Sequence, residues 1–232
     1  GDATADLLDA GAATAVLTCR EDAVLCGAAW FEACFRQLDP EVRIEWLVHD
    51  GDRVPAGSIA CRLAGKARAL VTAERSALNF LQLLSATATV TSRYADAIAG
   101  TRTRVLDTRK TLPGLRRAQK YAVLCGGGTN HRMGLFDAMM LKENHIIAAG
   151  GIPAAVEAAR RIHPTLPLIV EVETLDELAQ ALDAGADRAL LDNFTPAMLA
   201  EAVAFTAGRM PLEVSGNVEI DTIRAIAETG VD

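Results

Sequence analysis

The chain has 232 residues, half of them hydrophobic, and its 23 basic and 30 acidic side chains give a formal net charge of −7. An acidic chain with only 4% aromatic residues argues against a nucleic-acid-binding protein, which normally presents a basic face with aromatic stacking platforms. No apolar run approaches the ~20 residues that span a bilayer, and the first residues lack the basic start of a signal peptide, so we expect a cytoplasmic protein.

The first 72 residues predict a small α/β domain. Strands are expected over residues 13–20, 42–50 and 58–63, and one helix is expected over residues 28–38. A few short strands with one or two helices are typical of an α+β layer and not of a barrel.

A long helix is expected over residues 74–99, where leucine and alanine recur at helical spacing and Gly100 provides a stop. We expect this helix to connect the first domain, residues 1–72, to a second one. The second domain would then comprise residues 73–232.

Strands and helices alternate after Gly100. The expected strands are 103–106, 138–141, 168–172, 189–191 and 212–214, and the expected helices are 115–125, 152–162, 174–184, 196–206 and 220–229. Such repeated units predict a parallel α/β fold, either a barrel or an open sheet. Polar residues lie at or just after the C-terminal end of every strand: Asp107 to Lys110, Lys142 to His145, Glu171 and Glu173, Asp192 and Asn193, and Ser215 to Asn217. Strand ends of a barrel meet at one mouth, whereas an open sheet binds at one switch point, so five polar ends favour a barrel.

One segment is strongly cationic. Residues 102–132 contain eight lysines and arginines against a single acid, Asp107, and they surround the glycine run 126–128. Arg109 and Lys110 directly follow a strand, where they are placed to bind an anion, although a solvated charged face is the alternative. Arginine forks suit carboxylates and phosphates, and lysine supplies a point charge. A small polyanionic ligand is therefore expected here.

Two carboxylates are expected at the same mouth. Glu171 and Asp192 end successive strands, and two acids among cations are explained if they hold hydrated Mg²⁺ against a diphosphate. The alternative is that they pair with Lys110 or Lys142. The turn at Ser215 and Gly216 is a weaker signal for a phosphate site.

The five cysteines are odd in number and scattered, without a C-x-x-C pair. They predict free buried thiols and neither a disulfide framework nor a zinc site. Cys125 lies beside the glycine run but has no basic residue spaced as a partner, so we do not expect it to be a nucleophile.

Longer motifs resemble the quinolinate phosphoribosyltransferases, also called nicotinate-nucleotide pyrophosphorylases (carboxylating). The matching segments are Glu74-Arg-Ser-Ala-Leu-Asn-Phe80, Asp107-Thr-Arg-Lys-Thr-Leu-Pro-Gly-Leu-Arg116, Lys120-Tyr-Ala-Val, Gly126-Gly-Gly-Thr-Asn-His-Arg132, Leu141-Lys-Glu-Asn-His145, Glu171-Val-Glu173, Leu191-Asp-Asn193 and Glu213-Val-Ser-Gly216. Together they span essentially the whole chain.

The resemblance implies an N-terminal α/β sandwich followed by an incompletely closed parallel α/β barrel, as in type II phosphoribosyltransferases. It implies a pentosyltransferase that joins quinolinate to phosphoribosyl pyrophosphate with decarboxylation. The products would be nicotinate mononucleotide, pyrophosphate and CO₂, in de novo NAD synthesis.

The resemblance also implies roles for individual residues. The quinolinate carboxylates would bind Arg109, His131, Arg132 and Lys142, joined by Arg75 from a second subunit of a homodimer or higher oligomer. The phosphoribosyl donor would contact Lys110 and Lys142, its Mg²⁺ and ribose hydroxyls would be served by Glu171 and Asp192, and its 5′-phosphate by Ser215 and Gly216.

The chain departs from the family pattern at three places. The family's chains begin with helical sequence ahead of Asp2, and they continue past Asp232 into another barrel strand and a phosphate-contacting glycine turn. We therefore expect the printed residues to be part of a longer protein. Residues 85–87, Ser-Ala-Thr, replace the more usual Ser-Gly-apolar run, a change that would affect helix packing.

Three other functions stay open. A paralogue with the same scaffold could act on another acceptor, such as the relative found with molybdate transport. Nicotinate as acceptor would leave part of the cationic cluster unpaired, which is costly. A non-catalytic sensor could bind either substrate and signal through a dimer, because a fold does not by itself fix a function.

Overall fold

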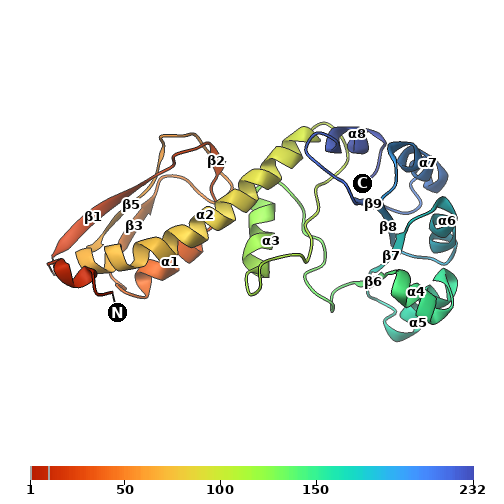
Figure 1. The fold of residues 1–232 in the computed structure, drawn as a ribbon, viewed down its shortest axis with the longest axis horizontal. Helices are drawn as coiled ribbons and strands as arrows, with labels where there is room; N and C mark the ends of the chain where they lie inside the picture. Colours follow the sequence, from red (N-terminus) through yellow and green to blue (C-terminus); the bar gives the residue numbers. More distant parts are fainter. Residues whose placement is uncertain (1, 10) are drawn as a thin grey trace. The chain divides into compact units, whose positions relative to one another are not determined.

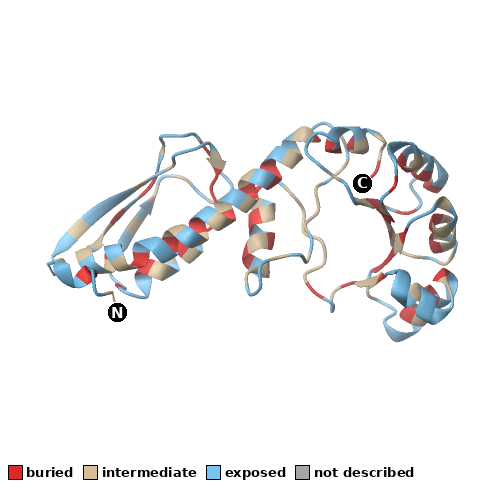
Figure 2. Cartoon of the chain, viewed as in Figure 1, coloured by how far each residue is buried: buried red, intermediate tan, exposed pale blue. Residues whose placement is uncertain are grey.

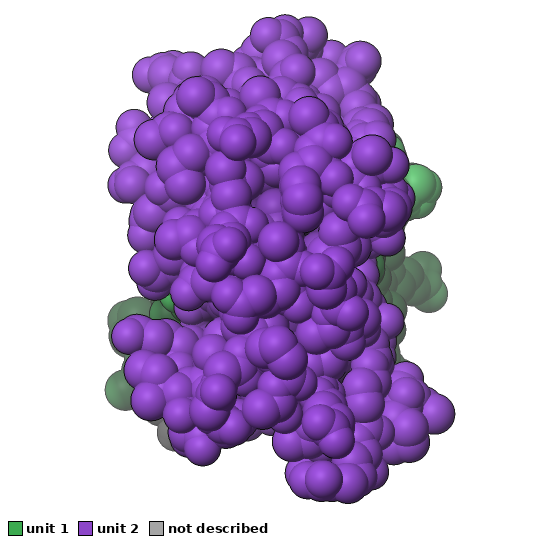
Figure 3. All heavy atoms as spheres, turned by 90° about the vertical axis from the view of Figure 1, so that its right-hand side faces the viewer, with its two compact units in different colours: residues 1–93, 110–130 green, residues 94–109, 131–232 purple. Residues whose placement is uncertain are grey.

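The computed structural model describes residues 2–9 and 11–232, and it divides into two compact units. Unit 1 contains the chain up to residue 93 and residues 110–130, whereas unit 2 contains residues 94–109 and 131–232 (Figure 3). The expected boundary at residues 72 and 73 lies within a continuous helix, α2 (Ala67–Ala97). Each unit has its own hydrophobic core and is described by itself.

Unit 1 contains the expected small α/β layer. Its main antiparallel sheet has the order β1-β5-β3 and a second strand pair joins β2 to β4. The elements are the short helix η1 (Ala5–Leu7), β1 (Ala12–Thr18), β2 (Ala23–Val24), α1 (Ala28–Arg36), β3 (Arg43–Trp46), β4 (Arg53–Val54) and β5 (Ile59–Lys66). The three predicted strands and the predicted helix are confirmed, with ends that differ by a few residues.

Helix α2 packs one apolar face against this layer. The buried residues Leu70, Ala73, Ala77 and Leu81 recur at intervals of three and four, and they join Phe31 of α1 in one core. The red stripe along α2 in Figure 2 marks this buried face. The helix begins seven residues before the predicted start because β5 runs into it directly at Ala67. Gly100, with a positive φ of 82°, follows its end.

The glycine run packs closely against α2. It follows α3 (Arg116–Cys125), whose residues Ala118 and Ala122 share a buried cluster with Leu84 and Ala88. A Cβ on Gly126 would lie 2.3 Å from the carbonyl oxygen of Ala88 and 2.6 Å from Cβ of Thr91. The absence of a side chain at Gly126 thus allows two helices to approach, and this contact explains it without a ligand.

Replacing Gly126 by Ala should destabilise the protein by about 1–3 kcal/mol, the usual cost of overpacking a core. The free energy of unfolding, measured by urea denaturation, checks this. Gly11→Ala is the matched control, because no atom lies within 4 Å of a Cβ built at Gly11. Equal stability of the two variants would contradict the packing role.

Unit 2 is a parallel α/β domain. One face of its sheet, with the order β6-β7-β8-β9, is covered by helices (Figure 1). The elements are β6 (Met139–Leu141), α4 (Glu143–Ala149), α5 (Ile152–Ile162), β7 (Leu168–Val172), α6 (Leu175–Asp183), β8 (Arg188–Asp192), α7 (Pro196–Thr206), β9 (Leu212–Ser215) and α8 (Ile223–Glu228). Four of the five predicted strands are confirmed, and so are four of the predicted helices; the fifth, over residues 115–125, is α3 of unit 1. The parallel α/β class is correct.

Two local predictions were wrong in unit 2. Residues 103–106 form no strand, because none of the four strands pairs with them beyond an isolated bridge at Leu106. The segment is fixed in another way: the hydroxyl of Thr103 donates to the carbonyl oxygen of Val231 at 2.7 Å, and Val105 packs against Ile223. Helix α4 was not predicted, since its polar start resembles a loop. Over the described residues the sheet remains open.

The cysteine thiols are free, and those of Cys26 and Cys61 are buried. Within the described ranges 2–9 and 11–232, no helix is both long and apolar enough to cross a membrane.

Candidate functional site

Three predicted site residues lie on the same face of the unit 2 sheet. In the strand register Glu171 pairs with Leu190, and Asp192, two residues further along β8, pairs with Ser215. Side chains alternate between the two faces of a sheet, so Glu171, Asp192 and Ser215 share one face. The intervening residues, Val172 and Leu191, lie in the core beneath the helices. The predicted convergence of polar strand ends is therefore observed for β7, β8 and β9.

Lys142 joins this group from the end of β6. It is the N-cap of α4, and its backbone N–H donates to Nδ1 of His145 at 3.1 Å. Its Nζ lies 2.5 Å from Oε2 of Glu171, and about half of the Lys142 side chain is exposed. Glu171 is thus paired with Lys142, which is the alternative that was expected for this carboxylate. This pairing is compatible with a later exchange of partners.

Two asparagines hold the turn beside Asp192. Nδ2 of Asn193 donates to Oδ2 of Asp192 at 3.0 Å, and Nδ2 of Asn217 donates to Oδ1 of Asn193 at 3.4 Å. Both asparagines have left-handed backbones, with φ of 57° and 53°, a strained conformation that is common at functional sites. A Cβ on Gly216 would lie 2.2 Å from Oδ1 of Asn193. The turn at Ser215 and Gly216 is therefore tightly built.

Arg109 and Arg132 form the cationic part of the site in unit 2. Burial lowers the pKa of Arg132, the positive charge of Arg109 lowers it further, and the charges of Asp137 and Glu213 oppose the shift. The two guanidinium groups are thus close enough to repel each other. Two half-buried guanidinium groups are a suitable receptor for a carboxylate, because each can donate two hydrogen bonds to it. This geometry is compatible with the predicted role of both arginines in binding the quinolinate carboxylates.

His131 lies deeper, in a charged trio that the sequence did not reveal. Its Nε2 lies 3.0 Å from Oε2 of Glu213, and Arg188 forms an ion pair with the other oxygen of that carboxylate. Burial alone would raise the pKa of Glu213, but the hydrogen bonds from His131 and Arg188 outweigh it and hold the pKa below its ordinary value. Glu213 is therefore a carboxylate at neutral pH.

The lowered pKa of Glu213 predicts how this residue affects stability. A lowered pKa favours folding above the ordinary value of 4.5, and this contribution disappears as the pH falls through the folded-state pKa. The difference in unfolding free energy between the wild type and Glu213→Gln should therefore be largest near pH 7 and shrink below pH 4.5. Urea denaturation at a series of pH values measures it, and a difference that grows on acidification would contradict the prediction.

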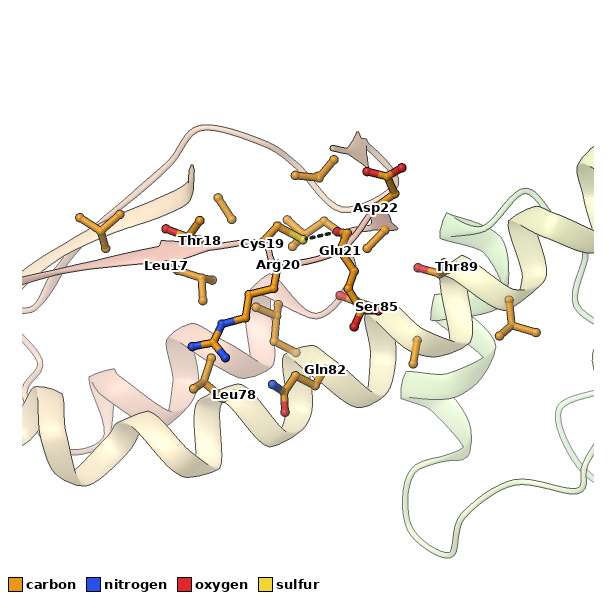
Figure 4. Close-up of a pocket in the computed structure, with 18 of the residues that line it drawn as sticks. Leu17, Thr18, Cys19, Arg20, Glu21, Asp22, Leu78, Gln82, Ser85 and Thr89 are labelled. Carbon is orange, nitrogen blue, oxygen red and sulfur yellow. Dashed lines mark hydrogen bonds between the residues drawn. The ribbon is translucent and has the colours of Figure 1, made fainter. Parts of the chain in front are cut away.

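Arg75 and Lys110 belong to unit 1, so the structure does not place them next to the residues above. Arg75 is exposed on α2. It helps to line a groove of about 890 Å³ between α2 and residues 16–23. Figure 4 shows Arg20 reaching over the groove towards Leu78 and Gln82 of α2. The groove carries charges of both signs, because its lining includes Arg20, Arg75 and Arg93 together with Glu21, Asp22 and Glu74.

The carboxylates of the site could bind Mg²⁺ only if a bound ligand also coordinated the ion. Among the residues that the structure describes, no three His, Cys, Asp or Glu side chains are grouped so that they could hold a metal. Glu171 and Asp192, however, supply two carboxylates on one face. Mg²⁺ typically takes one or two carboxylates together with water and substrate phosphates, and these residues fit that arrangement.

The comparisons with known proteins agree along the chain. Residues 2–85 match the family model of the quinolinate phosphoribosyl transferase N-terminal domain, and residues 87–232 match that of the C-terminal domain. A solved structure of the nicotinate-nucleotide pyrophosphorylase from Francisella tularensis is similar, with a TM-score of 0.98 and 49% identity over 100% of this chain and 83% of that one.

Curated relatives give the same family. A chloroplastic nicotinate-nucleotide pyrophosphorylase (carboxylating) from rice, Oryza sativa, is 42% identical over 94% of this chain and 64% of its own length. A Synechocystis protein named as a probable enzyme of the same kind is 43% identical over 92% of this chain and 74% of its own length. The chain thus spans slightly less than two thirds of the rice protein.

Proposed function

The chain belongs to the quinolinate phosphoribosyltransferase family, and we propose that it transfers the phosphoribosyl group of phosphoribosyl pyrophosphate to quinolinate with loss of CO₂. The products are nicotinate mononucleotide and pyrophosphate, in NAD biosynthesis. The observation that supports this most directly is the pair of half-buried guanidinium groups, Arg109 and Arg132, in the same unit as the carboxylates at the strand ends. The guanidinium groups can bind the carboxylates of a dicarboxylic acid, and the carboxylates of the protein can accept hydrogen bonds from ribose hydroxyls.

In the proposed reaction the protein acts electrostatically. Pyrophosphate leaves from a ribose with oxocarbenium character, and the pyridine nitrogen attacks the same carbon. The carboxylate beside the new cationic nitrogen then leaves as CO₂, and the ring carbon takes up a proton. Arg109, Arg132 and Lys142 hold the dicarboxylate and the departing charge in place. Pre-placed donors of this kind are typically worth ~2.7–4 kcal/mol each.

The donor side of the proposal uses Glu171, Asp192, Ser215 and Lys110. Glu171 and Asp192 would hold the ribose hydroxyls and, together with the diphosphate, Mg²⁺. Bound Mg²⁺ would neutralise charge on the leaving pyrophosphate. Lys110 contacts the donor, and the turn at Ser215 and Gly216 receives the 5′-phosphate through backbone N–H groups. Lys142 exchanges its partner Glu171 for substrate when the site fills.

The test is product formation by the purified protein. It is incubated with phosphoribosyl pyrophosphate, Mg²⁺ and either quinolinate or nicotinate, with and without a chelator, and nicotinate mononucleotide is measured. We expect product from quinolinate alone, and none after chelation. If product formed from nicotinate alone, the acceptor would be nicotinate and not quinolinate. Tight binding of both substrates by folded protein without any product would favour a sensor.

We further propose a homodimer in which Arg75 enters the site of the second subunit. Its exposed position on α2, beside a groove in unit 1, leaves it accessible to such a neighbour. A cytoplasmic location belongs to the proposal too; one of the curated relatives is named as chloroplastic and another as mitochondrial.

Mixed dimers test the shared site. Arg75→Ala and Lys142→Ala should each inactivate the protein, and refolding them together should restore part of the activity. A mixed dimer contains one site with both wild-type side chains, because Arg75 comes from the other subunit. The matched control is a mixture of Arg109→Ala and Lys142→Ala, which share one unit and should stay inactive. A mixture with Arg75→Ala that also stays inactive would place Arg75 outside the neighbour's site.

A further inference from the structure

A charged trio lies on the sheet face of unit 2 that carries the site. Glu213, the second residue of β9, is only 6% exposed, and it accepts hydrogen bonds from His131 and from Arg188 at the start of β8. Interiors of parallel α/β barrels are usually filled by branched apolar side chains. A buried ion pair is also rarely needed for stability, since apolar residues of similar volume often replace it without loss. Stability alone therefore does not explain why these three charged residues lie here.

The hydrogen bonds determine the tautomer of His131. The backbone N–H of Arg132 lies 2.7 Å from Nδ1 of His131. A backbone N–H can only donate, so Nδ1 is the acceptor and carries no proton. The proton of the neutral ring is then on Nε2, which donates to Oε2 of Glu213 at 3.0 Å. A carboxylate at position 213 selects this tautomer, because it can only accept.

The same contacts fix the segment that carries Arg132. The backbone N–H of His131 donates to Oδ1 of Asp107 at 2.9 Å, so both the backbone and the ring of His131 are held. The guanidinium of Arg132 reaches the carbonyl oxygen of Ala138 at 3.3 Å. It does so although Arg109 repels it, and the negative charges of Asp137 and then Glu213 oppose that repulsion. Without this support, two like charges would move apart before an anion arrives.

We propose that Glu213, itself held by Arg188, is a positioning residue for quinolinate: it fixes the ring of His131 and thereby keeps Arg132 beside Arg109, ready for a carboxylate. The inference rests on the proposed function and deepens it. His131 acts through its position, since both of its ring nitrogens already have partners in the protein. Arg188, which no motif of the sequence analysis included, becomes part of the acid-binding side of the site.

Two variants test the proposal by separating the two substrates. Glu213→Gln keeps the shape of the side chain but can accept from only one of its two donors, and Arg188→Met removes the second donor. In both variants the KM for quinolinate should rise on the order of ten- to a hundredfold, the scale seen when reacting groups are misplaced. The KM for phosphoribosyl pyrophosphate should change less than twofold. Glu213→Asp should recover part of the quinolinate affinity.

A spectroscopic measurement needs no substitution. The ¹⁵N shifts of the His131 ring in wild-type protein should report a ring that is protonated at Nε2 and accepts a hydrogen bond at Nδ1. A wild-type ring protonated at Nδ1 overturns the proposal, whether or not the variants fold.

A matched ion pair on another part of unit 2 controls for stability. Arg160 of α5 pairs with Asp187 at 2.8 Å, so Arg160→Met should lower the melting temperature without changing the KM for quinolinate. If Glu213→Gln behaves like Arg160→Met, the trio is only structural and the inference fails. If wild-type protein makes no product from quinolinate, the proposed function fails instead. The two failures are therefore distinguishable.

Discussion

Replacing Arg109 by Ala should lower kcat/KM for quinolinate by about 10²–10³-fold, which corresponds to ~2.7–4 kcal/mol of lost transition-state stabilisation. The physical reason is the position of its guanidinium, which lies close enough to Arg132 to lower the pKa of that residue. Two such groups repel each other until an anion lies between them. The loss of Arg109 removes one of the two guanidinium groups that would bind the anion. Steady-state kinetics with purified variants measures the effect.

The control for Arg109→Ala is another arginine of the same unit. Arg161 is exposed on α5, so Arg161→Ala removes the same charge without touching the sheet face. Its kcat/KM should stay within twofold of the wild-type value. Arg109→Lys adds a second comparison, because lysine keeps the charge but loses the fork that binds a carboxylate through two hydrogen bonds. Near wild-type kinetics in a folded Arg109→Ala protein would remove this residue from the site.

The sequence predicted the parts of the fold that depend on local periodicity. The predicted strand over residues 168–172 has the bounds that β7 has in the structure, and the helices α5, α6 and α7 lie within a residue or so of their expected ranges. In these segments the apolar residues recur with a helical or strand period, and a recognisable cap or turn residue marks the boundary, such as Thr174 before α6. Local pattern and tertiary packing agree there, so a single sequence is sufficient.

Where packing decides, the prediction from sequence was incomplete. Residues 103–106 have an apolar strand pattern, but no neighbour among the described strands completes a ladder with them. Helix α4 begins with Lys142, Glu143 and Asn144, which resemble a loop. It is stabilised by His145, whose ring accepts the N–H of its own N-cap residue, and a histidine is not a common cap signal. The glycine run was expected to lie beside a ligand, whereas the close contact of Gly126 with α2 explains the glycine at this position.

The site, like the fold, contains residues that the sequence predicted and residues that it did not. Polar residues at the C-terminal ends of the strands indicated Glu171, Asp192 and Ser215, because parallel strand ends converge wherever such a sheet forms. Glu213 has no such signal: its partner His131 is 82 residues away in the chain, and Arg188 starts its strand instead of ending it. A contact between residues so distant in sequence is set by the strand order. Nothing in the local sequence around Glu213 reveals that order.

Replacing Lys142 by Met should be as damaging as the loss of Arg109, with kcat lower by about 10²–10³-fold. Lys142 is placed to serve both substrates, since it directly follows β6 and contacts Glu171 on the neighbouring strand β7. Met is an unbranched side chain only one atom shorter than Lys, and it removes the charge. The matched control is Lys66→Met, which breaks a lysine–carboxylate pair with Asp39 in unit 1 and should leave kcat unchanged.

A double variant decides whether Lys142 acts on substrate or only neutralises Glu171. If its role were limited to that pair, Glu171→Gln would relieve the unpaired carboxylate, and the double variant would lose no more activity than the worse single one. If Lys142 and Glu171 contact different groups of the substrates, the double variant should lose more than either single variant, although residues in contact rarely give strictly additive effects. We expect the second result, because half of the Lys142 side chain remains open to solvent beside Glu171 and can reach a ligand. A double variant that regains activity would instead assign Lys142 a structural role.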